Sequence, residues 1–179
     1  MRKVTLYISM SLDGFAADTD GGVDWLYGNE PDCGEGSYED FISGVDTVIM
    51  GRKTYEQVTG ELSPGEWPYA GLSCYVLTRQ KCEITFTDEE PADLVAALRA
   101  EPGRGIWICG GPETAGRFLR AGLVDEYRIA VIPALLGGGV RLFGDLAPRR
   151  LRLVRTLVYG GIAELIYENN DNISDKYEV

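Results

Sequence analysis

The stretch Val48-Ile49-Met50-Gly51-Arg52-Lys53-Thr54-Tyr55 joins an unbroken apolar run to a polar segment through a single glycine. An apolar run without alternation is typical of a strand that is covered on both faces, as in a parallel sheet. The residues after Gly51 predict a helix that carries Tyr55 and Val58 and stops before Pro64. Such a strand–helix unit is the building block of an α/β protein.

The alternation of strand and helix continues along the rest of the chain. Strands are predicted at residues 4–11, 46–50, 73–77, 84–86, 105–109 and 127–132, and further helices at 37–43, 91–99 and 112–121. Residues 151–159 and 163–167 alternate around Gly160-Gly161 and predict an antiparallel hairpin. We therefore expect one α/β domain over residues 1–168, with helices on both faces of a mostly parallel sheet and a C-terminal antiparallel β-hairpin. Residues 169–179 are expected to form a polar C-terminal tail that frays.

The composition excludes several classes of protein. The chain has 179 residues and no histidine, which removes Ser-His-Asp and Cys-His catalysis as well as histidine-bound zinc sites. Its formal net charge is −11, so we expect it to bind neither nucleic acid nor an anionic membrane surface. No apolar run approaches the roughly 20 residues of a membrane span. The start of the chain is too short and too alternating for a signal peptide, and the four cysteines are scattered. These features predict a reduced, cytoplasmic protein without disulfides or a metal site.

Three of the predicted strands end in residues that suit a phosphate group. Ligands of such sheets bind beyond the carboxyl ends of the strands. Gly51-Arg52-Lys53-Thr54 can form an anion cradle or a tight turn with solvated basic residues. Thr78-Arg79 suits a phosphate on a ribose, although a surface arginine is the simpler interpretation. Gly110-Gly111-Pro112 suits a pyrophosphate at a helix N-terminus or a sharp turn. A dinucleotide that crosses the sheet would account for all three ends.

Five short motifs follow one another along the chain. They are Ser9-Met10-Ser11-Leu12-Asp13-Gly14, Asp24-Trp25-Leu26, Met50-Gly51-Arg52-Lys53-Thr54-Tyr55-Glu56, Val76-Leu77-Thr78-Arg79 and Cys109-Gly110-Gly111-Pro112. In this order they resemble the motifs of the dihydrofolate-reductase-like superfamily. The stretch from Pro133 to Phe143, with its glycines at 137–139, resembles the RibD C-terminal-domain branch, which includes riboflavin-pathway reductases. The resemblance covers residues 2–168 and implies a three-layer α/β/α fold of the dihydrofolate-reductase type.

The resemblance also implies NADPH as the cofactor. By this resemblance, Gly51, Arg52, Lys53 and Thr54 would meet its phosphates, and Thr78 and Arg79 its adenosine ribose and 2′-phosphate. The pyrophosphate and nicotinamide side would be lined by Gly110, Gly111, Pro112, Glu113 and Thr114, and the Gly110–Gly111 bond would be cis. We expect Arg52, Lys53 and Arg79 to form a small positive area on an otherwise acidic surface.

The candidates on the substrate side are fewer. Asp13 and Glu35 are the candidate catalytic carboxylates, although Asp13 can instead hold a turn and Glu35 can be a solvated loop residue. Trp25 can wall the substrate pocket or belong to the core, and Gly138 can hold a substrate anion or let its loop bend.

The function that follows is an NADPH-dependent reductase. We expect hydride transfer to a pterin-like or 5-amino-6-(5-phosphoribosylamino)uracil-like substrate, related to riboflavin biosynthesis. The alternatives are a dihydrofolate reductase and an NADPH-binding protein without turnover. A homodimer is expected from the resemblance.

Overall fold

The fold is built on a single twisted sheet. The computed structural model describes residues 1–26, 36–78 and 86–170. Within this part, eight strands pair in the order β5-β4-β3-β6-β1-β7-β10-β9. Their bounds are β1 Val4–Ser11, β3 Val45–Gly51, β4 Ser73–Leu77, β5 Phe86–Thr87, β6 Gly105–Gly110, β7 Glu126–Ile132, β9 Leu151–Tyr159 and β10 Ile162–Asn169. All pairings from β5 to β7 are parallel, and β10 pairs antiparallel with β7 and β9. The expected mostly parallel sheet with a C-terminal antiparallel hairpin is therefore confirmed.

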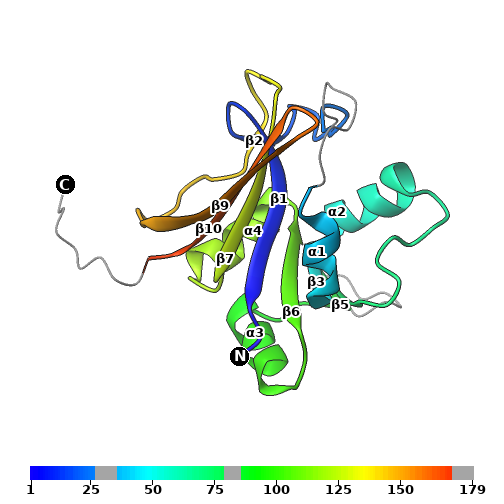
Figure 1. Ribbon diagram of the computed structural model, residues 1–179. Helices are drawn as coiled ribbons and strands as arrows, with labels where there is room; N and C mark the ends of the chain where they lie inside the picture. The colour runs from blue at the N-terminus through cyan, green and yellow to red at the C-terminus, as the bar shows by residue number, and fades with distance from the viewer. Residues whose placement is uncertain (27–35, 79–85, 171–179) are drawn as a thin grey trace.

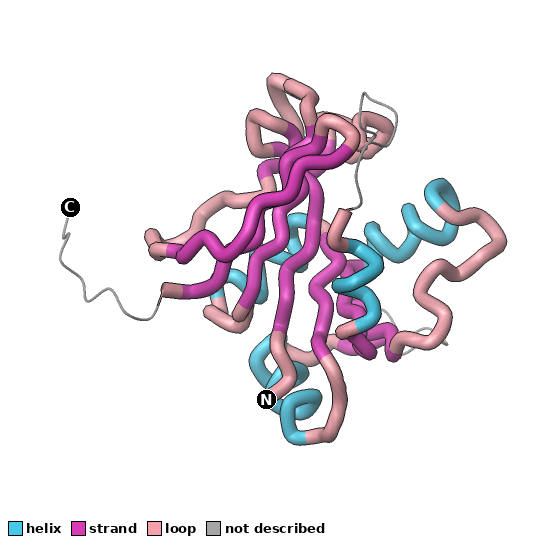
Figure 2. Tube along the Cα trace, in the orientation of Figure 1, coloured by secondary structure: helices cyan, strands magenta, loops and turns pink. Residues whose placement is uncertain are grey.

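Helices cover both faces of this sheet. They are α1 Tyr38–Ser43, α2 Arg52–Gln57, α3 Pro91–Ala100 and α4 Pro112–Arg120, and α2 continues into a π-helical turn, η1, at Val58–Leu62. Figure 1 shows the β9–β10 hairpin at one side of the molecule and α2 at the opposite side, and Figure 2 shows helices on either side of the strand layer. Each predicted helix is present, and its ends lie close to the expected ones.

The two faces have separate hydrophobic clusters. Ile49 of β3 packs with Leu94 of α3 and Phe118 of α4 on one face. Its neighbours Val48 and Met50 pack on the other face, with α1. Successive side chains of a strand point to opposite faces, so the unbroken apolar run of β3 supplies both clusters. This is the physical meaning of the run that predicted a central strand.

A second, two-stranded sheet was not predicted from the sequence. Strands β2, Phe15–Ala17, and β8, Val140–Arg141, pair antiparallel although they are more than 120 residues apart. Strands of two and three residues leave no periodic pattern, which is why local reasoning treated both as loop. Gly139 makes the pairing possible: its φ is 132°, and a Cβ placed on it would collide with the backbone oxygen of Ala17.

No helix within the described residues is long and apolar enough to cross a membrane. Cys74 and Cys109 are free thiols, whereas Cys33 and Cys82 lie outside the described residues. In the same part of the chain, no group of three or more His, Cys, Asp and Glu side chains could hold a metal ion.

Replacing Gly139 by alanine should destabilise the fold by about 2 kcal/mol or more, because strained φ and a backbone collision add together. Gly137 offers a matched control, because it has φ of 70° and open space around its Cα. Gly137→Ala should cost only about 1 kcal/mol, the cost of left-handed backbone alone. Urea unfolding of both variants measures the difference, and equal costs would contradict a packing role for Gly139.

Candidate functional site

A cleft of about 820 Å³ lies at the carboxyl ends of the central parallel strands. Strands β4, β3 and β6, whose ends carried the three phosphate-binding predictions, are consecutive neighbours in the sheet. The cleft is lined by the turns that follow β3 and β6, by the middle of β1, and by residues of β2, β8 and the β9–β10 hairpin. The small sheet that the sequence analysis missed thus forms part of the cleft wall.

Nine of the eleven predicted cofactor residues lie together in the cleft. They are Gly51, Arg52, Lys53, Thr54, Gly110, Gly111, Pro112, Glu113 and Thr114. The Gly110–Gly111 peptide bond is cis, as expected. Thr78 lies beside the strand end without lining the cleft, and Arg79 falls outside the described residues. The fold therefore brings the ends of β3 and β6 together in one site. The contribution of Arg79 stays a prediction.

The turn after β3 and the beginning of α4 approach each other closely. A Cβ placed on Gly51 would collide with Oγ1 of Thr114, and a Cβ on Gly111 would lie 3.1 Å from Oγ1 of Thr54. Each glycine therefore faces the threonine of the other turn. The lack of a side chain at both positions lets the two turns pack directly against each other at the edge of the cleft.

Three basic side chains surround this part of the cleft. Lys53 is exposed there, and Arg52 forms an ion pair of 2.6 Å with Glu56, one helical turn away. Arg117 of α4 also lines the cleft and pairs with Glu90 at 3.3 Å. Arg117 was not predicted from the sequence, because it lies in mid-helix, where a basic residue indicates only a solvated face.

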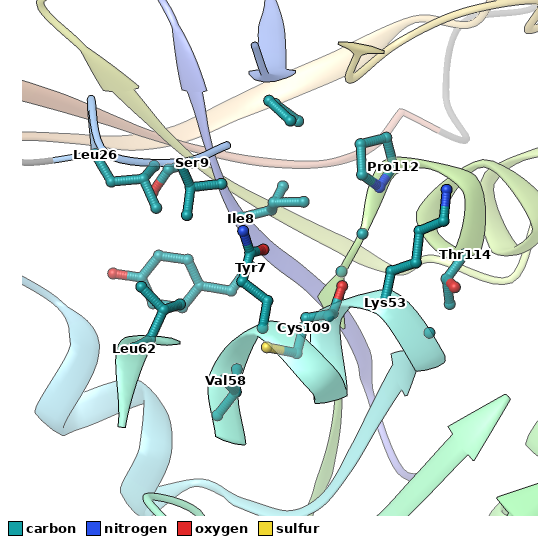
Figure 3. Close-up of a pocket in the computed structure, with 18 of the residues that line it drawn as sticks. Tyr7, Ile8, Ser9, Leu26, Lys53, Val58, Leu62, Cys109, Pro112 and Thr114 are labelled. Atoms are coloured by element: carbon teal, nitrogen blue, oxygen red, sulfur yellow. The ribbon is translucent and has the colours of Figure 1, made fainter. Parts of the chain in front are cut away.

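Aromatic side chains form another part of the cleft wall. Tyr7, Tyr38, Tyr69 and Trp107 all line the cleft. The rings of Tyr69 and Trp107 meet edge to face at 5.1 Å between centroids, and Tyr38 lies 6.1 Å from Trp107. Figure 3 shows Lys53, Pro112 and Thr114 on one side of the cleft, and Tyr7, Ser9 and Leu26 on the other. The cleft therefore combines a polar, glycine-rich side with an aromatic side.

Asp13 holds a loop of the structure and does not line the cleft. Its carboxylate accepts hydrogen bonds from the backbone N–H groups of Leu136 at 3.1 Å and Gly137 at 2.7 Å, and from the Ser11 hydroxyl at 2.6 Å. The hydrogen bond from Ser11, followed by those from the two backbone groups, lowers the pKa of Asp13 to about 2. These contacts match the turn-holding role that the sequence left open.

The other substrate-side candidates are also placed away from the cleft or are not described. Trp25 donates a hydrogen bond from Nε1 to the backbone oxygen of Gly22 at 3.3 Å, and its neighbours Val23 and Leu26 line the cleft in its place. Gly138 lies against Thr19, outside the lining. Glu35 lies outside the described residues.

One buried carboxylate was missed entirely. Glu164 lies on β10 with no exposed surface, behind the cleft residues Tyr7 and Tyr159. The sequence predicted only a hairpin strand here, and a polar residue in an alternating strand is typical of a solvent-facing position. Ser37, at the N-terminal end of α1, packs against Glu164 together with Tyr7 and Tyr159.

Comparison with known proteins places this architecture in a family. The model of the RibD C-terminal domain matches residues 2–162. The chain belongs to the RibD C-terminal domain family.

Similar proteins match more than nine-tenths of the chain. The uncharacterized protein YwjB of Bacillus subtilis is 42% identical over 172 residues, which cover 93% of this chain and 97% of YwjB. The crystal structure of a putative riboflavin biosynthesis protein from Shewanella sp. PV-4 is 28% identical, with a TM-score of 0.83 and coverage of 94% and 99%.

A deaminase/reductase from Thermotoga maritima has the same fold. Its structure superimposes with a TM-score of 0.70 at 15% identity, over 94% of this chain and 57% of that one. Membership of the RibD C-terminal domain family supports a reductase-like enzyme with the three-layer fold that the sequence predicted.

The low pKa of Asp13 predicts a pH-dependent contribution to stability. The carboxylate stabilises the fold fully above its unfolded pKa, near 3.8, and this contribution is lost as the pH falls through about 2. Asp13→Asn should therefore be less stable than the parent protein above pH 3.8, and the difference should shrink toward pH 2. Urea unfolding across this range measures it. A difference that stays constant with pH would contradict the role of the ionised carboxylate.

Proposed function

We propose that this protein is an NADPH-dependent reductase that reduces an electrophilic C=N or C=O carbon of a pterin-like or 5-amino-6-(5-phosphoribosylamino)uracil-like substrate. The observation that carries the proposal is the meeting of two glycine-rich strand–helix turns at one cleft, each facing the other's threonine. This arrangement matches the phosphate-binding pattern expected from the sequence, in a family that includes reductases.

The residues of the cleft fit a dinucleotide. Gly51 and Gly111 expose bare backbone where the two turns meet at the cleft. Lys53 and Arg117 can balance phosphate charge in a protein that is otherwise strongly acidic. Thr54 and Thr114 add hydroxyl donors beside them. NADPH would supply the hydride. The chain's own part is to hold the two reactants in register and to exclude water from the apolar cleft.

The aromatic wall supports a flat substrate. Planar rings gain both buried area and favourable edge or face contacts against tyrosine and tryptophan. Tyr38, Tyr69 and Trp107 offer such contacts beside the cofactor residues. A planar heteroaromatic head could lie against them, with its reacting carbon turned toward the end of β6.

The remaining predicted roles keep the status of proposals. Asp13, Trp25 and Gly138 do not line the cleft, and Glu35 lies outside the described residues. The proton-donating roles of Asp13 and Glu35 and the substrate contacts of Trp25 and Gly138 are therefore proposals. Arg79 is proposed to read the 2′-phosphate and so to select NADPH over NADH. A cytoplasmic location also stays a prediction.

We also propose that the protein forms a homodimer. Strand β9 is the free edge of the sheet, and its side chains are exposed on both faces, with Leu153 52% and Val158 72% exposed. An exposed apolar edge strand is normally covered by a partner. The molar mass from light scattering tests this proposal.

Replacing Lys53 by alanine should weaken NADPH binding about tenfold, because a charge-assisted hydrogen bond to phosphate contributes about 1.5 kcal/mol or more. Arg117→Ala should act similarly. Arg120→Ala is the control, since Arg120 is exposed on the same helix but does not line the cleft. Fluorescence titration with NADPH measures the affinities. Unchanged affinity in both cleft variants would refute the proposed cofactor site.

Turnover separates the proposed reductase from its alternatives. Oxidation of NADPH is followed with 5-amino-6-(5-phosphoribosylamino)uracil and, separately, with dihydrofolate. Turnover of the first compound supports the proposal, whereas turnover of dihydrofolate alone identifies a dihydrofolate reductase. Binding of NADPH without turnover of either compound favours a non-catalytic NADPH-binding protein.

A further inference from the structure

Glu164 is a fully buried carboxylate whose neighbours are all hydrogen-bond donors. The hydroxyl of Ser37 donates to Oε1, and the backbone N–H of Ser37 reaches Oε2 at 3.4 Å. The hydroxyl of Tyr7 donates to Oε2 at 3.2 Å, and that of Tyr159 donates to the same oxygen at 3.0 Å. Four donors therefore converge on one carboxyl group.

Arg128 fixes the direction of the bond from the Ser37 hydroxyl. Its Nη1 lies 3.1 Å from Oγ of Ser37, and a guanidinium can only donate. The Ser37 oxygen accepts from Arg128, so its own proton points to Glu164. Arg128 is in turn held by Glu126 at 2.6 Å. An ionised carboxylate, which is an acceptor only, satisfies every contact of Glu164 without a conflict.

The two tyrosines have no proton left for a ligand. A phenol has one proton and two acceptor lone pairs. Tyr7 and Tyr159 both give that proton to Glu164, yet both line the cleft. The Tyr7 oxygen also contacts the hydroxyls of Ser37 and Tyr159, so Tyr159 offers the freer acceptor lone pair. Their contacts with Glu164 are partly exposed, whereas the contact between Ser37 and Glu164 is buried. Among the groups around Glu164, the two tyrosines are therefore the ones that a ligand in the cleft can reach.

Electrostatics maintains this arrangement. Burial raises the pKa of the Tyr7 hydroxyl, and the negative charge of Glu164 raises it further. Burial is also the first cause of the raised pKa of Tyr159, to which the charge of Glu164 contributes. Both phenols thus keep their protons and remain donors to the carboxylate.

The two sides of the cleft consequently have opposite character. Lys53 and Arg117 border the glycine-rich side, which suits anionic groups. Tyr7 lies across the cleft from Lys53 in Figure 3, with its hydroxyl on a buried anion. A hydrogen-bond donor is favoured on this aromatic side, and a carbonyl or anionic group is disfavoured.

We propose that Glu164 is a positioning residue that turns Tyr7 and Tyr159 into hydrogen-bond acceptors, so that the cleft selects substrates with N–H or O–H groups at this end. The assignment of this end to the substrate rests on the proposed function, which places the cofactor at the opposite side. The acceptor character itself follows from the contacts of Glu164 alone.

The test uses two flat probes of the same ring, 2-aminoquinoline and 2-methoxyquinoline, which differ in carrying donor N–H groups or only an acceptor oxygen. Their affinities are measured by ligand-observed NMR, with and without saturating NADPH. The parent protein should bind the amino probe at least about tenfold more tightly than the methoxy probe. This factor corresponds to about 1.4 kcal/mol, the effect of making one hydrogen bond or of leaving one unsatisfied.

Glu164→Gln should reverse this preference. The glutamine amide donates to a phenol oxygen, which frees a phenol proton to point into the cleft, so the methoxy probe should gain affinity while the amino probe loses it. Glu168→Gln is the matched control, because Glu168 lies on the same strand and pairs with Lys3 and Arg152. This control should keep the preference of the parent protein.

Tyr159→Phe provides a second, independent variant if Glu164→Gln does not fold. Removing one acceptor should lower the affinity for the amino probe and leave that for the methoxy probe nearly unchanged. A parent protein that binds neither probe, or binds both equally, overturns the proposal. So does a Glu164→Gln variant that weakens both probes by the same factor. Failure of NADPH titration with an intact probe preference instead refutes the proposed cofactor site alone.

Discussion

The cleft depends on one close approach between two backbone turns. The turn after β3 and the beginning of α4 lie so near each other that Gly51 has no room for a Cβ beside Thr114. The parallel pairing of β3 with β6 brings these turns to the same end of the sheet. Any side chain at Gly51 would push the turns apart and displace the hydroxyls that line the cleft. The positions of Lys53, Thr54 and Arg117 around the cleft follow from this contact.

A strongly acidic chain must concentrate its few positive charges where they are needed. Ion pairs occupy several of them for structure: Lys3 and Arg128 hold Glu126, and Arg99 holds Asp125. Lys53 borders the cleft, and so does Arg117, which also pairs with Glu90. The only fully buried carboxylate among the described residues, Glu164, lies behind the opposite wall. One side of the cleft is therefore positively charged and the other lies in front of a buried negative charge. This local difference can orient a ligand, which the net charge of the whole protein cannot do.

Local sequence patterns predicted the main helices and strands well, because each of these elements is formed by residues that are close together in the sequence. The bounds of β1 and β4 agree with the predicted ranges, and Leu94 and Leu98 of α3 are buried as the helical spacing requires. The Gly-Gly motif after β6 lies at the cleft, with its bond cis as the family resemblance implied. Asp13 is an example of what a motif does not predict. A motif identifies the residue but does not indicate whether its side chain faces a ligand or a loop. Here the carboxylate faces the backbone of the loop at residues 136–137.

The order of strands and helices, the glycine-rich strand ends and the exclusion of histidine chemistry all followed from the order and types of the residues, because periodicity and turn chemistry act over a few neighbours. The pairing of β2 with β8, the place of Arg117 in the cleft and the burial of Glu164 came only from the tertiary structure. Each joins segments that are far apart along the chain. The solvation of a side chain depends on what packs over it, and for Glu164 that is Ser37, 127 residues away.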